Sequence, residues 1–173
     1  MKKKAKIRIG IVGISGRMGK SIAMAISKSS DLILTAGCEH KKHKDIGKDI
    51  GLVLGNKTIG ELVTSNHKEF CKNIDVIIEF GLEKATKEYL AVAKKNNIAF
   101  ISGSTALSKN TLKDMQLASK HIPVFWAPNM SIGANLLKKL SQELAYKLGS
   151  NFDIDITDLH HKNKKDLPSG TAL

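Results

Sequence analysis

The 173-residue chain carries its densest set of reactive side chains in the segment HHKNKKDLPSGTAL, residues 160–173. A histidine donates a proton near neutral pH, and a lysine does so where neighbouring positive charge lowers its pKa. Ser169 is a good N-cap residue, so we expect the backbone N–H groups of Gly170 and Thr171 to be free to bind a carboxylate. The segment therefore predicts acid–base chemistry on an anionic substrate, although the residue types alone describe a solvated turn equally well.

The residues that precede this segment indicate in which directions its side chains point. The preceding stretch DIDITDL, residues 153–159, alternates polar and apolar residues as a half-buried strand does. At the end of such a strand, His160 and His161 point to opposite faces, so one of them can face a cleft. Lysines follow within a few residues, and Asp166 is better suited to orient the loop than to act as an acid or base. No carboxylate–His–Cys set is present, so we expect no bound metal.

The first forty residues contain a pattern typical of nucleotide binding. A predicted strand, KIRIGIV, runs directly into GISGRMG, residues 13–19, and a predicted helix follows. Glycines permit the tight turn and let the backbone approach a pyrophosphate, whose charge is met by N–H groups at the helix start. Ser15 stands where the second glycine of the common pattern often lies. Glu39 follows the second predicted strand, where a carboxylate binds the ribose. This context favours a dinucleotide over an empty glycine-rich turn.

The sequence after Glu39 leaves two cofactors open. Glu39 favours the free ribose 2′-hydroxyl of NADH. The stretch HKKHK, residues 40–44, follows at once and could meet the 2′-phosphate of NADPH, or it could be a solvated loop. We therefore expect NADH, NADPH or both.

Strands and helices alternate along most of the chain, which predicts a parallel sheet covered on both faces. The fold class is α/β, a Rossmann-like doubly wound parallel sheet, followed by the beginning of an α+β substrate domain with a mixed or antiparallel sheet that starts at residues 153–159. We divide the chain into a dinucleotide-binding domain, residues 1–129, and the start of a substrate domain, residues 130–173. The predicted strands are 6–12, 32–38, 75–80, 98–103, 123–128 and 153–159, the predicted helices are 17–29, 84–96, 109–119 and 132–149, and residues 40–64 are expected to be loop with short pieces.

Composition narrows the possible partners. The net charge is +12, which suggests an anionic partner such as nucleic acid, a phosphorylated cofactor or an acidic substrate. The lysines are scattered and form no stripe with interleaved aromatic residues, so we expect no nucleic acid. No apolar run approaches the ~18 residues of a membrane span. The two cysteines, Cys38 and Cys71, show no metal-ligand spacing and are expected to be thiols in a reducing cytoplasm.

Taken together, GISGRMG and the C-terminal segment resemble the dihydrodipicolinate reductases, also called 4-hydroxy-tetrahydrodipicolinate reductases, of the bacterial diaminopimelate–lysine pathway. The family signature is close to His-His-x-x-Lys-x-Asp-x-Pro-Ser-Gly-Thr-Ala. It is met here by His160, His161, Lys164, Asp166, Pro168, Ser169, Gly170, Thr171 and Ala172. The resemblance implies an enzyme that passes hydride from a nicotinamide cofactor to a cyclic, conjugated dicarboxylate.

Residue roles follow from the resemblance by motif position. It implies that His160 is the catalytic acid or base and that Lys164 is its catalytic partner. It implies that the substrate carboxylate is bound by His161, Ser169, Gly170 and Thr171. The residues that it implies for the cofactor are Gly13, Ile14, Ser15, Gly16, Arg17, Met18, Glu39, His40, Gly103, Ser104, Thr105, Ala127, Pro128, Asn129 and Met130.

The chain also departs from the family pattern. His40 stands where the family often has arginine, Ala106 ends a stretch that is Gly-Thr-Thr-Gly in the family, and Glu79-Phe80-Gly81 replaces Asp-Phe-Thr or Asp-Phe-Ser. Family chains continue well past the C-terminal motif and usually form homotetramers. We therefore expect residues 1–173 to be a fragment or a truncated protein, in which the first domain folds but turnover is poor. Two alternatives are another NAD(P)-dependent amino-acid dehydrogenase on the same fold and a non-catalytic nucleotide-binding module.

Overall fold

The computed structural model describes residues 5–157 and 159. The chain divides into two compact units, Met1–Trp126 and Ala127–Leu173.

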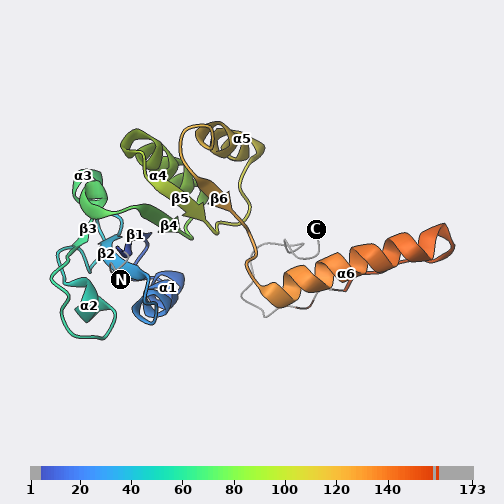
Figure 1. Cartoon of the computed structure of the whole chain (residues 1–173), viewed down its shortest axis with the longest axis horizontal. Coiled ribbons are helices and arrows are strands. Elements are labelled where there is room, and N and C mark those ends of the chain that lie inside the picture. Colours follow the sequence, from blue (N-terminus) through green and yellow to red (C-terminus); the bar gives the residue numbers. More distant parts are fainter. Residues whose placement is uncertain (1–4, 158, 160–173) are drawn as a thin grey trace. The chain divides into compact units, whose positions relative to one another are not determined.

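The first unit is built on one parallel sheet. Its strands are β1 (Ile7–Val12), β2 (Leu32–Cys38), β3 (Val63–Thr64), β4 (Val76–Glu79), β5 (Ala99–Ser102) and β6 (Val124–Trp126). They lie in the order β3-β2-β1-β4-β5-β6, and every neighbouring pair is parallel (Figure 1). The chain starts at the centre, builds outwards to β3, returns to β4 and builds outwards again, so the predicted doubly wound sheet is confirmed.

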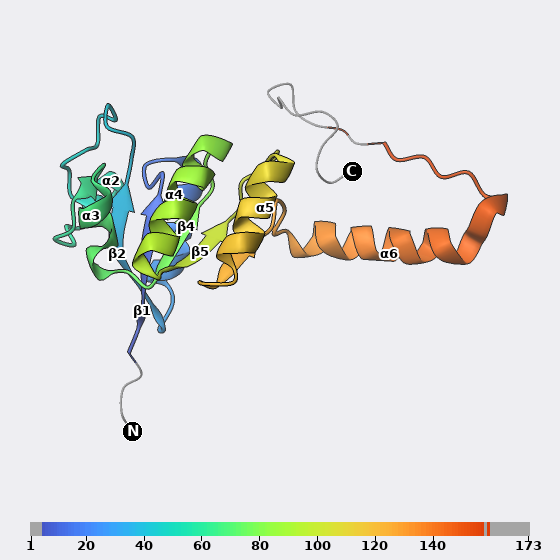
Figure 2. The same cartoon turned by 90° about the horizontal axis from the view of Figure 1, so that it is seen from above.

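Helices cover both faces of this sheet. They are α1 (Arg17–Ser27), α2 (Ile50–Val53), α3 (His67–Phe70), the 3-10 helix η1 (Cys71–Asn73), α4 (Glu83–Asn96) and α5 (Lys109–Ala118). α4 and α5 lie side by side on one face of the sheet, and α1 lies on the other (Figure 1, Figure 2). Because the strands are all parallel, each connection from a strand to the next helix of this unit begins at the carboxyl edge of the sheet.

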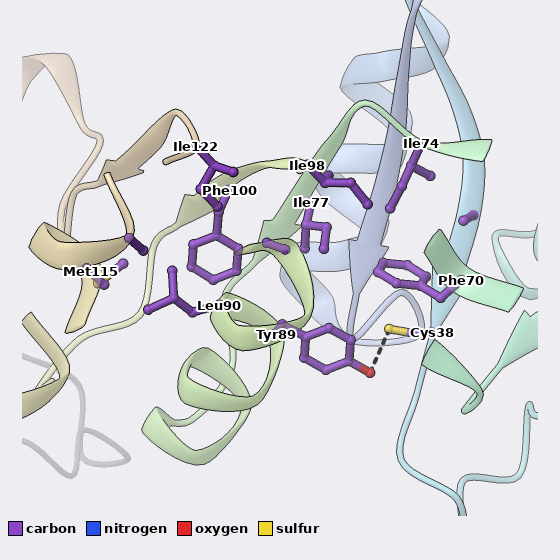
Figure 3. Packing of buried hydrophobic residues seen from close by; sticks show 13 residues of the cluster. Cys38, Phe70, Ile74, Ile77, Tyr89, Leu90, Ile98, Phe100, Met115 and Ile122 are labelled. Atoms are coloured by element: carbon purple, nitrogen blue, oxygen red, sulfur yellow. Dashed lines mark hydrogen bonds between the residues drawn. The ribbon is translucent and has the colours of Figure 1, made fainter. Parts of the chain in front are cut away.

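A separate hydrophobic cluster fills each side of the sheet. Successive side chains of a strand point to opposite faces, so Ile9 and Ile11 of β1 pack with α1, whereas Ile77 of β4 and Phe100 of β5 pack with Leu90 of α4 (Figure 3). Burial of such a side chain contributes about 1.5–3 kcal/mol. The same period of two decides which polar residues at the strand ends are carried into the interior.

The cluster beside α4 also holds one polar pair. Burial raises the pKa of the Cys38 thiol to about 12, so the thiol stays protonated and donates a hydrogen bond to the Tyr89 hydroxyl at 3.1 Å (Figure 3). Cys38 therefore has a structural role in the core.

Residues 40–64 contain short pieces of structure, as predicted. The Asp49 carboxylate organises this loop, because it accepts hydrogen bonds from the backbone N–H groups of Gly51, Leu52, Ile59 and Gly60. The next elements, α3 and η1, were not predicted. They are too short for a helical hydrophobic period to be visible in the sequence.

The second unit contains α6 (Ile132–Leu148) and the 3-10 helix η2 (Gly149–Asn151). The predicted strand at residues 153–159 is wrong for the residues described there, because 153–157 and 159 are in no strand. A strand is stable only when another strand pairs with its backbone. The described part of this unit contains no second strand, so the alternating sequence forms no sheet and both Ile154 and Ile156 are exposed.

Within the described ranges 5–157 and 159, no helix is at once long enough and apolar enough to cross a membrane.

Candidate functional site

The carboxyl ends of five strands form one row across the sheet. Val12 of β1 pairs with Cys38 of β2 and Glu79 of β4, Glu79 pairs with Ser102 of β5, and Ser102 pairs with Trp126 of β6. The residues that follow this row within the first unit are Gly13, Glu39, Phe80 and Gly103. Neighbouring strands lie about 4.8 Å apart, so the predicted cofactor residues of this unit are brought to one edge. Open parallel sheets bind ligands at this edge, where the strand order reverses.

The glycine turn after β1 has the backbone conformation that its sequence predicts. Gly13 has φ +73°, a left-handed conformation that glycine adopts without strain. A Cβ atom on Gly19 would lie 2.2 Å from the carbonyl oxygen of Gly13, so only glycine lets α1 start this close to the turn. The Gly13 N–H donates to the Cys38 carbonyl at 2.9 Å, which fixes the turn against β2.

The start of α1 is open to an anion. Its N-cap is Gly16, which has no side chain to cap the helix, and the first turn contains no acidic residue. The first N–H groups of a helix have no acceptor within the helix, and the helix dipole is positive at this end. Arg17 and Met18 are both exposed here. The predicted turn therefore combines unused donors with a positive end, which is the arrangement that binds a phosphate.

Glu39 lies directly beside this turn. Its Oε1 atom accepts a hydrogen bond from the Ser15 backbone N–H at 2.9 Å, and its own N–H donates to the Thr64 carbonyl at 3.0 Å. The half-buried carboxylate is thereby held between the glycine turn and the end of β3. Two segments that lie 24 positions apart in the sequence meet here.

The loop after Glu39 is cationic. His40 is exposed, and its ring contacts that of His43 edge to face at 5.4 Å between centroids. Lys48 donates to Asp45 at 2.8 Å, and this bond lowers the pKa of that carboxyl. A cavity of about 380 Å³ lies between this loop and α1, and it is lined by Lys20, Lys44, Asp45, Lys48, Asp49, Leu52 and Val53.

The stretch after β5 is tightly packed. A Cβ atom on Gly103 would lie 1.9 Å from the Phe80 ring, so glycine is required there. Ser104 is buried, and its hydroxyl lies 2.8 Å from both the Glu79 carboxylate and the Gly81 carbonyl. Its carbonyl accepts a hydrogen bond from the Trp126 indole at 3.0 Å. The polar atoms of Ser104 are thus engaged within the protein.

The most heavily bonded group at this edge, Glu79, was not predicted as a functional residue. Its carboxylate is fully buried and accepts hydrogen bonds from three hydroxyls and one backbone N–H. Strand alternation offered a signal, because Glu79 follows Ile77 by two residues and must point to the same buried face. The partners could not be found this way, since Ser102 and Ser104 belong to another strand and its loop.

A second carboxylate joins the same two loops farther out. Glu83 opens α4 and accepts from the Ser108 backbone N–H at 3.0 Å, and also from the hydroxyls of Ser108 and Thr111 at the start of α5. These bonds lower the pKa of Glu83 to about 2. Ala106 lies between Ser104, which is bonded to Glu79, and Ser108, which is bonded to Glu83. It adopts φ +54°, the left-handed conformation that favours glycine.

The remaining predicted residues belong to the second unit. The Asn129 side chain accepts from the Ser131 N–H at 2.9 Å, and the Asn129 carbonyl accepts from Asn135, so the stretch 127–130 is tied to the first turn of α6. The predicted catalytic and substrate-binding residues lie outside the described residues, and they are His160, His161, Lys164, Ser169, Gly170 and Thr171.

No three His, Cys, Asp or Glu side chains in the part of the chain that the structure describes are grouped so as to hold a metal ion.

The fold and this edge define a protein of the doubly wound, Rossmann-like class, with a dinucleotide-type glycine turn and an acidic residue after the second strand. The family model described as "Dihydrodipicolinate reductase, N-terminus" matches residues 7–130, and "Dihydrodipicolinate reductase, C-terminus" matches residues 133–173. The chain belongs to the dihydrodipicolinate reductase family.

Curated relatives agree with this assignment. The chain is 36% identical over 167 residues to a 4-hydroxy-tetrahydrodipicolinate reductase of Syntrophobacter fumaroxidans, covering 96% of this chain and 62% of the relative. It is 38% identical over 169 residues to one of Wolbachia pipientis, covering 97% of this chain and 63% of the relative. The chain thus spans somewhat less than two thirds of the length of these relatives.

Two solved structures have a similar fold. A dipicolinate-bound dihydrodipicolinate reductase from Paenisporosarcina sp. TG-14 matches with a TM-score of 0.71 and 26% identity, over 96% of this chain and 63% of that one. A myo-inositol 2-dehydrogenase from Lactobacillus plantarum matches with a TM-score of 0.57 and 20% identity, over 80% of this chain and 41% of that one. The second likeness concerns the fold alone.

Proposed function

We propose that this chain binds NADH or NADPH and belongs to a reductase that converts 4-hydroxy-tetrahydrodipicolinate, or dihydrodipicolinate, to tetrahydrodipicolinate in the diaminopimelate–lysine pathway. Residues 1–129 would bind the cofactor, and residues 130–173 would begin the substrate domain. The observation that carries the proposal is the pairing of the Glu39 carboxylate with the Ser15 N–H beside the uncapped start of α1. Family membership supplies the substrate class.

The glycine turn fits the pyrophosphate of a dinucleotide. Nothing lies within 4 Å of the place where a Cβ atom of Gly13 would be, so a phosphate can approach the backbone there. The unused N–H groups at the start of α1 would receive its charge. Glu39 would accept hydrogen bonds from the ribose hydroxyls of the adenosine half.

The surroundings of Glu39 bear on the choice between the two cofactors. A carboxylate at this position repels a 2′-phosphate and so favours NADH. The exposed lysines that follow, Lys41 and Lys42, and the cationic cavity beside α1 offer compensating charge to NADPH. We therefore propose that both are bound, and that Glu39 contributes more to NADH.

The substrate would be held by the C-terminal motif. A bound reduced nicotinamide supplies hydride to the conjugated ring. We assign His160 as the acid that donates a proton to the ring as negative charge develops on its conjugated system, with Lys164 as its catalytic partner. His161, Ser169, Gly170 and Thr171 would bind a substrate carboxylate through cationic and backbone N–H donors. The motif match and the family model over residues 133–173 support these roles.

Beyond the substrate, we propose that the whole protein is a cytoplasmic homotetramer that needs neither nucleic acid nor a membrane as a partner. The scattered placement of the lysines supports the absence of a nucleic-acid surface.

Titration of the purified chain with NADH, followed by nicotinamide fluorescence, tests the proposal. We expect an enhancement that changes when pyridine-2,6-dicarboxylate, a planar dianion resembling the product, is added. Asp114→Asn, an exposed carboxylate of α5, is the control that should bind like the wild type. Binding to DNA with a steep salt dependence, and none to NADH, would instead support a nucleic-acid-binding module.

A further inference from the structure

Glu79 has no part in the proposed cofactor contacts, yet its burial demands an explanation. The residue is 0% exposed and ends β4, in the register row between Val12 and Ser102. Burying a carboxylate is costly unless hydrogen bonds replace its water. An apolar side chain could be buried at this position without that cost. The role of Glu79 therefore lies in the hydrogen bonds that its carboxylate accepts.

Those bonds join four separate pieces of the chain. The Oε1 atom accepts from the hydroxyls of Thr86 at 2.7 Å, Ser102 at 2.5 Å and Ser104 at 2.8 Å. The Oε2 atom accepts from the Gly81 backbone N–H at 2.8 Å. The donors come from the β4–α4 turn, the first half of α4, the end of β5 and the loop after β5. A single side chain therefore ties two loops to the sheet and to a helix.

The two loops are also locked to each other. The Gly103 N–H donates to the Glu79 carbonyl at 2.9 Å, and the Ser104 hydroxyl reaches the Gly81 carbonyl at 2.8 Å. The Phe80 ring lies so close to Gly103 that no side chain fits there. Residues 80–82 and 103–105 thus form one unit, which we call the Glu79-bound loops.

The position of these loops in the sheet indicates which half of a dinucleotide they meet. In a doubly wound sheet each half of the dinucleotide lies over one half of the sheet. Glu39, the proposed ribose ligand of the adenosine half, follows β2 on one side of β1. The Glu79-bound loops follow β4 and β5 on the other side. They therefore border the place of the nicotinamide half.

We propose that Glu79 is a positioning residue, whose carboxylate holds residues 80–82 and 103–105 in the shape that receives the nicotinamide ring. The inference rests on the proposed function, because it needs a nicotinamide cofactor at this edge. Glu79 itself, being fully buried, touches neither cofactor nor substrate in this role.

The test compares NADH with ADP-ribose, which lacks the nicotinamide, by isothermal titration calorimetry on the full chain. Glu79→Gln keeps the volume of the side chain. The Gly81 N–H can only donate, so the amide oxygen must face it and the amide nitrogen must face the hydroxyls, which lose their shared acceptor. We expect the Kd for NADH to rise roughly tenfold, while that for ADP-ribose stays within about twofold.

Two controls separate positioning from a general loss of stability. Asp75→Asn makes the same carboxylate-to-amide change just before the other end of β4, where Asp75 pairs with Arg8, and it should leave both Kd values unchanged. Thr86→Val removes one hydroxyl that donates to Glu79 and should raise the Kd for NADH alone, whereas Thr86→Ser keeps a hydroxyl and should not.

The outcomes distinguish this inference from the proposed function. If the wild type binds NADH and Glu79→Gln binds it equally well, or if both nucleotides weaken together in Glu79→Gln and in Thr86→Val, the positioning role is refuted and NADH binding stands. If the wild type binds neither NADH nor ADP-ribose, the proposed function fails and this inference fails with it.

Discussion

Ala106 offers the sharpest test of the structure, because one substitution should have opposite effects at two places. Ala106 has φ +54° in the exposed loop between β5 and α5. A non-glycine residue in this region costs roughly 1–2 kcal/mol, and glycine costs roughly 0.5–1 kcal/mol more than alanine in conformational entropy. The difference predicts that Ala106→Gly raises the free energy of unfolding by about 0.5–1 kcal/mol.

The matched control is Ala25→Gly, an exposed alanine inside α1. There the backbone is already right-handed, so glycine brings only its entropic cost and should lower the free energy of unfolding by about 0.5–1 kcal/mol. Urea titrations of both variants measure the difference, and a stabilised variant should also melt higher by roughly 2–4 °C for each kcal/mol. If both variants are destabilised by the same amount, Ala106 is not left-handed and the geometry of this loop is wrong.

Three further predictions use other parts of the first unit. The Arg8 guanidinium and N–H lower the pKa of Asp75 to about 2 from its usual 3.8, so the pair stabilises the fold fully above about pH 4 and loses this effect as the pH falls towards 2. Urea midpoints of the wild type and Asp75→Asn should therefore differ at pH 6 and converge near pH 2, and a constant difference would contradict the pair. Gly19→Ala places a Cβ atom 2.2 Å from the Gly13 carbonyl, which should cost about 1–3 kcal/mol and abolish NADH binding; Gly133→Ala, which meets open space in α6, should leave binding intact. Glu39→Ala should weaken NADH more than NADPH in a fluorescence titration, and equal losses would remove the ribose role.

The fold could be predicted from the sequence because its signals are local. KIRIGIV predicts a strand, the helix after GISGRMG has its apolar residues at helical spacing, and repeated alternation of the two predicts parallel strands. The same locality limited the prediction of the ends of elements: the strand expected at residues 75–80 spans Val76–Glu79. Whether the first or last residue of a strand pairs with its neighbour depends on tertiary contacts, which local sequence patterns do not describe.

One failure shows the limit of alternation as a signal. Residues 153–159 alternate as strictly as any strand of the chain, yet those described there are in no strand. Alternation says that one face of a strand would be apolar, but a strand also needs a partner for its N–H and C=O groups. The described part of the second unit provides none.

What the sequence alone determined is the glycine turn, the acidic residue after the second strand and the alternation of strands and helices, because each is written in residues close together in the chain. Only the tertiary structure decided which residues contact each other at the carboxyl edge. Glu79 is hydrogen-bonded to Ser102 and Ser104, which lie 23 and 25 positions away in the sequence, and Ser15 is hydrogen-bonded to Glu39, 24 positions away. These contacts follow from the register of the parallel strands, since pairing Val12 with Glu79 and Glu79 with Ser102 brings their loops to one edge. The register of the sheet therefore brings these locally encoded residues together at one edge.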